Sequence, residues 1–193
     1  MNKIAIILIG LFFLFLVPLI SHAQQYDLLI KNGLVIDPKN QINSMLDVAI
    51  ANGKIAKIEK NIPASNATKV IDASGLMVTP GLIDIHTHVF VGTRPDKFAD
   101  GILSLSPDDF TFKSGVTTVV DAGTSGWRNF PLFKSQVIDK SQTRVLAFLN
   151  IAGSGMSGDP GQQDLNDMDS KMTSLAVQKY SEIIVGIKIG HYG

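Results

Sequence analysis

The chain has 193 residues, with 17 Lys and Arg against 17 Asp and Glu, so its formal net charge is zero. That balance gives no basic surface of the kind that nucleic acid binding requires, and we expect no nucleic acid partner. Because the sequence contains no Cys, it excludes a disulfide framework, a thiolate metal site and a Cys nucleophile. A hydrophobic content of 45% and a charged content of 18% argue against a disordered chain.

Residues 1–23 have the layout of a secretory signal peptide. Lys3 is the one charge, residues 4–20 are apolar, and Ser21-His22-Ala23 places small residues three and one before a cleavage point. The alternative is an uncleaved membrane anchor, although the apolar stretch is near the lower length limit for a spanning helix and contains Pro18. We therefore expect an exported protein, most simply in a bacterial periplasm, which would touch a membrane only through an uncleaved signal.

Residues 24–80 are predicted to form a small β-domain. Short apolar stretches flank Asn32-Gly33 and Asn52-Gly53. An Asn-Gly pair between such stretches indicates a hairpin, because the favoured turn needs positive φ at both positions. A further strand is expected at residues 69–72, followed by a turn at Gly75. The pattern predicts an antiparallel unit that is thin for independent stability.

From residue 81 onward, the pattern changes to strands that alternate with helices. Apolar stretches typical of buried parallel strands recur at 82–85, 116–120, 145–151 and 183–189. Helices are expected from Ser106-Pro107-Asp108-Asp109 onward, near residues 130–139, and over about residues 165–180. The alternation predicts βαβ units with a parallel sheet, so the fold class is α/β.

Asp84-Ile85-His86-Thr87-His88 stands at the end of the first of these strands. Side chains alternate across a strand, so His86 and His88 are expected on the same side, as a candidate metal-binding pair. Two ordinary loop histidines are the alternative, since two ligands do not complete a site. Thr79-Pro80-Gly81 interrupts regular structure just before the strand, and the strand itself is apolar. Both features favour a rigidly held histidine pair.

Lys188 lies near the end of the fourth strand, among apolar residues, where a cation is costly to bury. Its side chain could simply reach solvent at the end of the strand. Alternatively, the amine could lose its proton and carry CO2 as a carbamate. That anion has two oxygens and could bridge two metal ions, whereas an ammonium group cannot bind a metal. The residues alone leave both alternatives open.

Polar and flexible positions after the later strands are candidates for contact with a substrate, namely Asn150, Gly153, Ser154, Gly155 and His191. Asn150 could equally be a cap or turn former, and a surface position is favoured over substrate contact for His191. The segment Gly153-Ser-Gly155-Met-Ser-Gly158 also fits a dinucleotide-binding pattern. However, Asp159-Pro160-Gly161 predicts a turn where a helix should begin, so a loop over an active site is favoured. Asp121, at the end of the second strand, is more typical of a cap or turn former than of a residue with a direct role.

Several segments between residues 26 and 193 follow a pattern known from one enzyme group. They are residues 26–33 (YDLLIKNG), 79–88 (TPGLIDIHTH), 114–123 (SGVTTVVDAG), 125–130 (SGWRNF), 148–151 (FLNI) and 185–188 (VGIK). Together they resemble the amidohydrolase superfamily, in its amidohydrolase/deacetylase branch related to dihydroorotases and D-aminoacylases. The segment that contains His86 and His88 is quite specific, whereas the Asn-Gly pair is only supportive.

The resemblance implies a (β/α)8 barrel of the TIM type and a small β-sandwich built from both ends of the chain. Residues 24–80 would be one half of that sandwich, and residues 81–193 would supply about four barrel strands. The resemblance also implies one or two divalent metal ions, usually zinc, at the carboxyl ends of the strands. His86 and His88 match the ligands of the first strand, and Lys188 matches the carbamylated lysine that bridges two metals.

The superfamily takes its remaining ligands from later strands, namely a His from each of strands five and six and an Asp from strand eight. That Asp also handles the proton of the attacking water, so no catalytic residue is assigned within the 193 residues. Since such a barrel takes about 250 residues, the chain resembles an N-terminal fragment.

The function that the resemblance implies is metal-dependent hydrolysis of a small molecule, of the deacetylase or dihydroorotase type. The bond would be an amide, a cyclic amide or a small acyl ester. An isolated half barrel would expose sheet edges. We therefore expect the chain alone to bind metal weakly and to associate, either as a homo-oligomer or as polydisperse aggregates. We also expect it not to hydrolyse substrate. The alternative is an exported, non-catalytic half barrel that holds a metal or ligand and dimerises.

Overall fold

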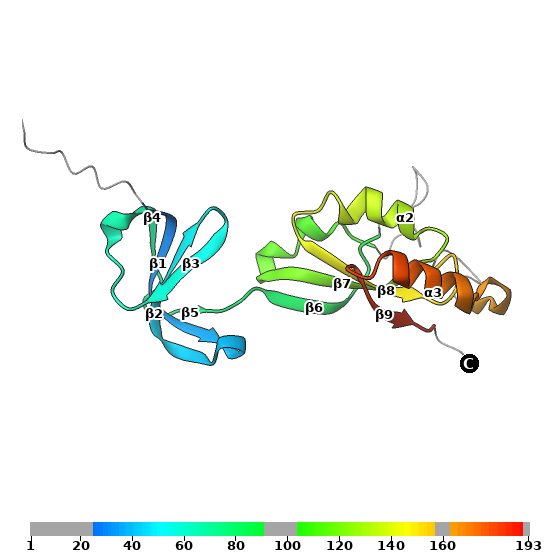
Figure 1. Cartoon of the computed structure of the whole chain (residues 1–193), viewed down its shortest axis with the longest axis horizontal. Coiled ribbons are helices and arrows are strands. Elements are labelled where there is room, and N and C mark those ends of the chain that lie inside the picture. Colours follow the sequence, from blue (N-terminus) through cyan, green and yellow to red (C-terminus); the bar gives the residue numbers. More distant parts are fainter. Residues whose placement is uncertain (1–24, 91–103, 157–162, 191–193) are drawn as a thin grey trace, which may run out of the picture. The chain divides into compact units, whose positions relative to one another are not determined.

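The computed structural model describes residues 25–90, 104–156 and 163–190. The chain divides between Pro80 and Gly81 into two compact units, and each is described here by itself (Figure 1). The signal expected at residues 1–23 lies outside the described residues and stays a prediction. Within the described ranges, no helix is long and apolar enough to cross a bilayer.

The first unit is built on a five-stranded sheet. Its strands are β1 (Tyr26–Asp37), β2 (Ile42–Ala51), β3 (Lys54–Glu59), β4 (Ala67–Asp72) and β5 (Met77–Val78). Their order is β3-β2-β1-β4, with β5 beside β1, and short 3-10 turns lie at Pro38–Asn40 and Ala64–Asn66. The hairpin predicted at Asn52-Gly53 is confirmed, since β2 and β3 pair antiparallel and the two turn residues have φ of 53° and 69°.

The hairpin predicted at Asn32-Gly33 is wrong, because β1 runs straight through this pair. Asn32 has a φ of 62°, and the pairing of β1 with β2 shifts register between Ile30 and Gly33. The N–H of Asn32 donates to Oδ1 of Asp47 at 2.8 Å. A carboxylate from the neighbouring strand therefore stabilises a bulge in place of a turn. The antiparallel prediction is also wrong in part, since β4 and β5 pair parallel to β1.

Asp47 is the buried polar centre of the first unit. It is 3% exposed, and its Oδ2 accepts hydrogen bonds from Nζ of Lys31 at 2.8 Å and from the N–H of Ile62 at 2.9 Å. Nζ of Lys31 also donates to the carbonyl of Ile62 at 2.7 Å. The charge pair thus ties β1 and β2 to the segment that follows β3.

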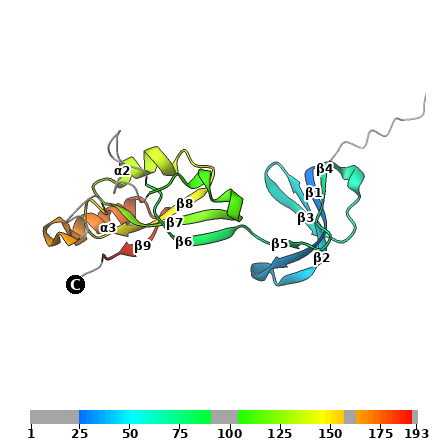
Figure 2. The ribbon, with the colours of Figure 1, turned by 180° about the vertical axis from the view of Figure 1, so that it is seen from behind.

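The second unit contains a four-stranded parallel sheet in the order β6-β7-β8-β9. Its strands are β6 (Leu82–Thr87), β7 (Val116–Gly126), β8 (Arg144–Asn150) and β9 (Ile184–Lys188). They run side by side when the molecule is seen from the front and from behind (Figures 1 and 2). The four strands predicted from the apolar stretches, and their parallel pairing, are therefore confirmed as a mixed α/β arrangement.

Helical segments pack on one face of this sheet. They are α2 (Phe130–Phe133), the π-helical turn Lys134–Ile138, and α3 (Ser170–Lys179). Their buried side chains share a core with alternating residues of β8 and with other strands: Phe130, Phe133, Val137, Ala176, Val119, Val145, Ala147, Leu149 and Ile184. The helix α3 is shorter than predicted, because a 3-10 turn at Leu165–Asp167 precedes it and Asp169 caps it by accepting the N–H of Met172 at 2.9 Å.

The helix predicted from Ser106 is wrong, because the chain forms two short 3-10 turns there, Pro107–Asp109 and Phe112–Ser114. The carboxylate of Asp108 does not cap a helix. It accepts hydrogen bonds from the N–H of Gln142 at 2.9 Å, and from the N–H and Oγ1 of Thr143 at 2.8 Å and 2.7 Å. Asp108 thus anchors the chain segment that leads into β8.

Candidate metal centre

His86 and His88 stand together where β6 ends. Their ring centroids are 5.6 Å apart, and the ring planes make an angle of 83°. Thr87, which lies between them, is buried, and its hydroxyl donates to the carbonyl of Val120 at 3.1 Å. The main chain that carries both imidazoles is therefore tied to the neighbouring strand β7.

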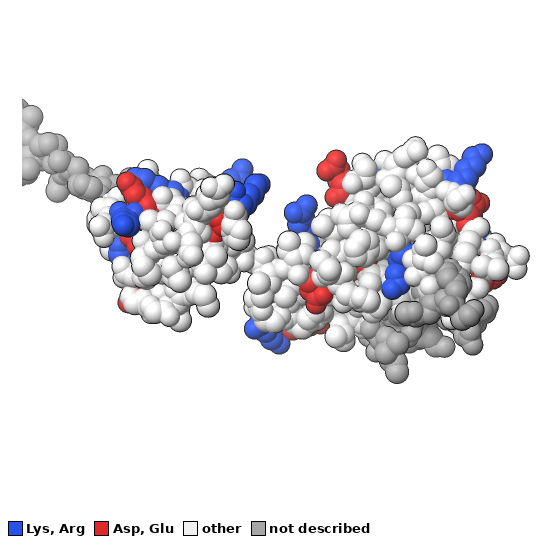
Figure 3. Space-filling model, turned by 90° about the horizontal axis from the view of Figure 1, so that it is seen from below, with Lys and Arg blue, Asp and Glu red and all other residues white. Residues whose placement is uncertain are grey.

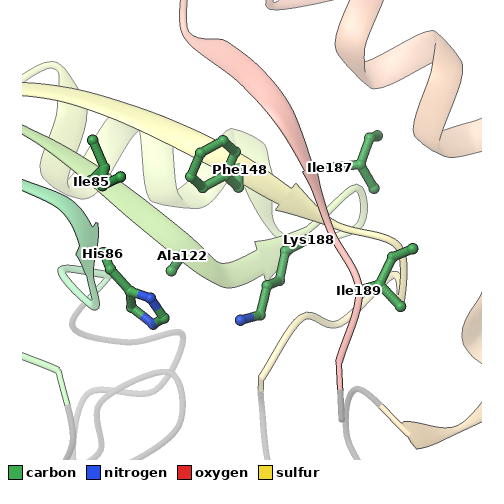
Figure 4. A pocket seen from close by; sticks show the side chains of 7 residues that line it. All are labelled: Ile85, His86, Ala122, Phe148, Ile187, Lys188 and Ile189. Carbon is green, nitrogen blue, oxygen red and sulfur yellow. The ribbon is translucent and has the colours of Figure 1, made fainter. Parts of the chain in front are cut away.

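Lys188, at the end of β9, lines the same cavity as His86. The cavity has a volume of about 250 Å³, and its other lining residues are Ile85, Ala122, Phe148, Ile187 and Ile189. Figure 4 shows the imidazole of His86 and the amine of Lys188 pointing toward one another across it. Within the part of the chain that the structure describes, no carboxylate pairs with the amine of Lys188. The fold thus brings two candidate donors together from the two edge strands of the sheet.

Gly123 makes room for the side chain of Lys188. Gly123 has a φ of 85°, and a β-carbon there would lie 2.4 Å from Cγ and 2.6 Å from Cβ of Lys188. Asn150, which pairs with Lys188 in the sheet, is fully buried. Its Nδ2 donates to the carbonyl of Gly123 at 3.0 Å, and its Oδ1 accepts the N–H of Ala152 at 3.0 Å. Asn150 therefore holds the main chain beside the cavity, through both ends of its amide.

Asp121 is fully buried and pairs with Thr87 in the sheet. Its Oδ2 accepts the N–H of Val89 at 2.8 Å, and its Oδ1 accepts the N–H of Thr124 at 2.8 Å. Burial raises the pKa of Asp121, although hydrogen bonds from Val89 and Thr124 and the charge of His88 oppose the rise. The hydrogen bond that Asp121 accepts from Thr124, three residues ahead, is typical of a turn former, the role that the sequence favours for Asp121.

Residues 153–156 of the glycine-rich segment are held against the end of β7. The N–H and hydroxyl of Ser154 donate to Oδ2 of Asp167 at 2.7 Å and 2.6 Å, while Nε of Arg128 donates to Oδ1 of Asp167 at 2.7 Å. Gly155 has a φ of 67°, and a β-carbon there would lie 2.3 Å from the carbonyl oxygen of Thr124.

The candidate substrate residues occupy different places. Gly153, Ser154 and Gly155 belong to this held loop and are not among the described residues that line the cavity of His86 and Lys188. His191 lies outside the described residues. The structure thus brings His86 and Lys188 to one cavity, with His88 beside His86 and Asn150 paired with Lys188 in the sheet, and places the glycine loop next to Thr124.

Sequence reasoning missed three residues that build this site, namely Gly123, Thr124 and Asp167. Gly123 follows Asp121-Ala122 near the predicted end of the second strand, and a glycine there is a usable signal for a left-handed position. Thr124 and Asp167 have no such signal, because their contacts depend on which strands and loops become neighbours in the fold.

The donors present fit a divalent metal in part. Imidazole nitrogens bind zinc, and a neutral or carbamylated lysine can bind where an ammonium cannot. Within the described ranges, no three or more His, Cys, Asp or Glu side chains gather so that they could hold a metal. Lys188 is therefore the residue that would bring a third donor to the histidine pair.

Charged side chains of both signs are visible on the face that Figure 3 shows. Figure 3 shows one face of the molecule, on which basic and acidic side chains are scattered among uncharged ones. That face therefore presents no single-sign field that would steer a highly charged partner.

Known proteins are similar in sequence to parts of this chain. No family model matches it. A deacetylase of Agrobacterium fabrum is 34% identical over 155 residues, which are 78% of this chain and 36% of the relative. A dihydroorotase of Streptococcus thermophilus is 54% identical over 100 residues, which are 51% of this chain and 22% of the relative. The matches thus span well under half the length of these relatives.

Solved structures share the fold. The crystal structure of an adenine deaminase matches with a TM-score of 0.65 and 32% identity, over 84% of this chain and 40% of that chain. The crystal structure of a dihydroorotase matches with a TM-score of 0.67 and 27% identity, over 83% of this chain and 41% of that chain. The chain therefore belongs to the amidohydrolase superfamily and corresponds to the N-terminal part of its deacetylase and dihydroorotase members.

Proposed function

We propose that this chain carries part of the metal centre of a hydrolase that cleaves C–N bonds in small amides or cyclic amides, with small acyl esters as a further class. The relatives named deacetylase and dihydroorotase support hydrolysis of this kind. The observation that carries the proposal is the convergence of His86 and Lys188 on one cavity, with His88 beside His86.

His86, His88 and Lys188 are the residues that would hold a divalent metal, for which zinc is the first choice. When bound, such an ion supplies Lewis acidity, which lowers the pKa of water and polarises a carbonyl group. His86 and His88 would offer neutral nitrogen donors from one strand whose main chain is fixed by Thr87. Their contribution is to bind and to orient.

Lys188 would act as a carbamate. Its neutral amine attacks CO2: a bond forms between nitrogen and carbon, one C=O π bond opens and places its electron pair on oxygen, and one proton leaves the nitrogen for solvent. The product is an anion with two oxygen donors, opposite the imidazole of His86. The lining of the cavity supports this role, because it offers no Asp or Glu among the described residues that would keep Lys188 as a paired ammonium.

The residues that line the cavity include no carboxylate to accept the proton of an attacking water, within the part of the chain that the structure describes. We therefore assign binding and positioning to this part of the protein, and no catalytic residue. Ile85, Phe148, Ile187 and Ile189 give the cavity an apolar wall, although Ile85, Ile187 and Ile189 are exposed to solvent in this chain.

Metal titration of the purified chain tests the proposal. We expect wild-type protein to bind Zn²⁺ or Co²⁺, and His86→Gln or His88→Gln to weaken binding by about tenfold or more. In ¹³C-labelled bicarbonate, wild type should show a carbamate signal that Lys188→Met lacks and that Lys179→Met, a change over the Tyr180 ring, retains.

Hydrolysis of N-acetylated amino acids and of dihydroorotate would be assayed with the same preparations. Because no catalytic residue is assigned to this chain, metal binding without hydrolysis is the expected result. A discrete metal-dependent dimer, measured by light scattering, would favour the alternative of a non-catalytic binding module. Wild-type protein that binds neither metal would refute the proposed centre.

A further inference from the structure

Thr124 connects three separate segments of the second unit. Its N–H donates to Oδ1 of Asp121 at 2.8 Å, and its carbonyl accepts the N–H of Met156 at 3.1 Å. Its Oγ1 lies 2.9 Å from Nδ1 of His88. Because Thr124 is fully buried, its hydroxyl must use its hydrogen-bonding capacity within the protein.

We infer that Thr124, held by Asp121, is a positioning residue that fixes His88 in the tautomer whose Nε2 is free to bind a metal. This inference rests on the proposed metal centre. A neutral imidazole has one N–H and one lone pair, so a proton on Nδ1 leaves the lone pair on Nε2. The opposite tautomer would place the proton on Nε2, where it would block a metal.

The direction of the bond between Thr124 and His88 follows from the proposed metal centre. A neutral imidazole that binds a metal through Nε2 carries its proton on Nδ1. Oγ1 of Thr124, at 2.9 Å, is then the acceptor of Nδ1–H. The N–H of Thr124 donates to Oδ1 of Asp121 at 2.8 Å, which fixes the main chain that carries this hydroxyl.

Asp121 also fixes the main chain beside His88. Its Oδ2 accepts the N–H of Val89, the next residue, at 2.8 Å. The carbonyl of His88 accepts the N–H of Leu105 at 3.0 Å. The ring of His88 is thus oriented by Thr124, while its backbone is held by Asp121 and Leu105. Metal-binding histidines commonly donate their second N–H to such a partner, and loss of the partner weakens metal binding.

Two substitutions of Thr124 test the inference. Thr124→Val removes the hydroxyl and keeps the shape of the side chain, whereas Thr124→Ser keeps the hydroxyl. In metal-free protein, at a pH where the ring is neutral, ¹⁵N NMR reports the tautomer of His88, with its signals assigned by comparison with His88→Gln. We expect the Nδ1–H tautomer in wild type and Thr124→Ser, and a gain of the Nε2–H tautomer in Thr124→Val.

Zn²⁺ affinity, measured by competition with a chelator, is the second readout. It should fall about 10–100-fold in Thr124→Val and stay within about threefold of wild type in Thr124→Ser. An Nε2–H tautomer in wild type, unchanged tautomer and affinity in Thr124→Val, or a serine variant as weak as the valine variant would each overturn the inference.

The two proposals fail in different ways. Wild-type protein that binds no divalent metal refutes the metal centre, while the tautomer of His88 in the metal-free chain still decides the role of Thr124. Circular dichroism identifies a variant that does not fold. If Thr124→Val is such a variant, the wild-type tautomer and the affinity of Thr124→Ser decide alone.

Discussion

The side chain of Lys188 lies directly against Gly123, so that a β-carbon at residue 123 would come within 2.4 Å of Cγ of Lys188. Gly123 also has a φ of 85°, a conformation that other residues rarely adopt. Two independent constraints therefore require glycine at this position, and one of them exists only because Lys188 passes over it.

Gly123→Ala should therefore be more destabilising than an ordinary glycine substitution at positive φ. Gly115→Ala is the matched control, since Gly115 has a φ of 75° in the same unit and the nearest atom to its β-carbon would be Cδ1 of Leu82 at 4.0 Å. We expect the control to lose about 1–2 kcal/mol from strain and Gly123→Ala to lose about 1–3 kcal/mol more from overpacking. Urea unfolding measures both, and equal losses would show that Lys188 moves aside freely.

Asp167→Ala should release the loop of residues 153–156. The carboxylate accepts hydrogen bonds from Nε of Arg128 and from both the N–H and hydroxyl of Ser154. We expect a loss of about 1–3 kcal/mol in unfolding free energy, together with faster amide hydrogen exchange at Ser154.

Asp139→Ala is the comparison for Asp167→Ala. Nζ of Lys134 lies 2.6 Å from Oδ1 of Asp139, but the two side chains are 34% and 49% exposed. Loss of such a pair changes stability by about 0–1 kcal/mol. Similar losses in the two variants would contradict the view that Asp167 organises the loop.

Asp108→Ala should destabilise the second unit, whereas its neighbour in the same 3-10 turn, Asp109→Ala, should not. Asp108 accepts three hydrogen bonds from Gln142 and Thr143, so its removal leaves these donors without their acceptor. We expect a loss of about 1–3 kcal/mol for Asp108→Ala and a change within about 0.5 kcal/mol for Asp109→Ala. Thermal or urea unfolding of the two variants side by side decides the matter.

The stability of the first unit should depend on acid through Asp47. Burial raises the pKa of Asp47, but hydrogen bonds from Lys31, Asn32 and Ile62 and the charge of Lys31 lower it overall, below 3.8. A carboxyl with a lowered folded pKa contributes stability above its unfolded pKa, and that contribution is lost as the pH falls through the folded pKa. The unfolding free energy should therefore fall as the pH drops below about 4.

Asp47→Asn tests this assignment. At neutral pH the variant should lose about 1–3 kcal/mol, because an amide nitrogen cannot accept the hydrogen bonds that one carboxylate oxygen accepts. Its unfolding free energy should also fall less steeply in acid. Some slope should remain, since hydrogen bonds from Ser74 and Asn32 lower the pKa of Asp72 as well. An unchanged slope would show that Asp47 does not control the acid response.

The sequence predicts those parts of the fold that depend on local patterns. Apolar stretches identify the four parallel strands, and Asn52-Gly53 identifies a hairpin. The same dipeptide at Asn32-Gly33 forms a bulge, because Asp47 on another strand binds the N–H of Asn32. The turn at Pro107–Asp109 fails to continue as a helix for a similar reason, since Asp108 is bound by residues far ahead in the chain.

The candidate site, too, can be predicted from the sequence only where it depends on local patterns. Because side chains alternate along a strand, the sequence alone predicts that His86 and His88 lie on the same side. The contacts of Thr124 with His88 and of Gly123 with Lys188 require β7 to lie between β6 and β9, which strand periodicity does not determine.

The hydrogen bond between the N–H of Met156 and the carbonyl of Thr124 has a dynamic consequence. The glycine loop restrains the backbone of Thr124, while the side chain of Thr124 contacts the imidazole of His88. A small molecule that lifts the loop would break this bond and loosen the ring of His88. Binding of such a molecule above the sheet would then lower the order of the histidine ring.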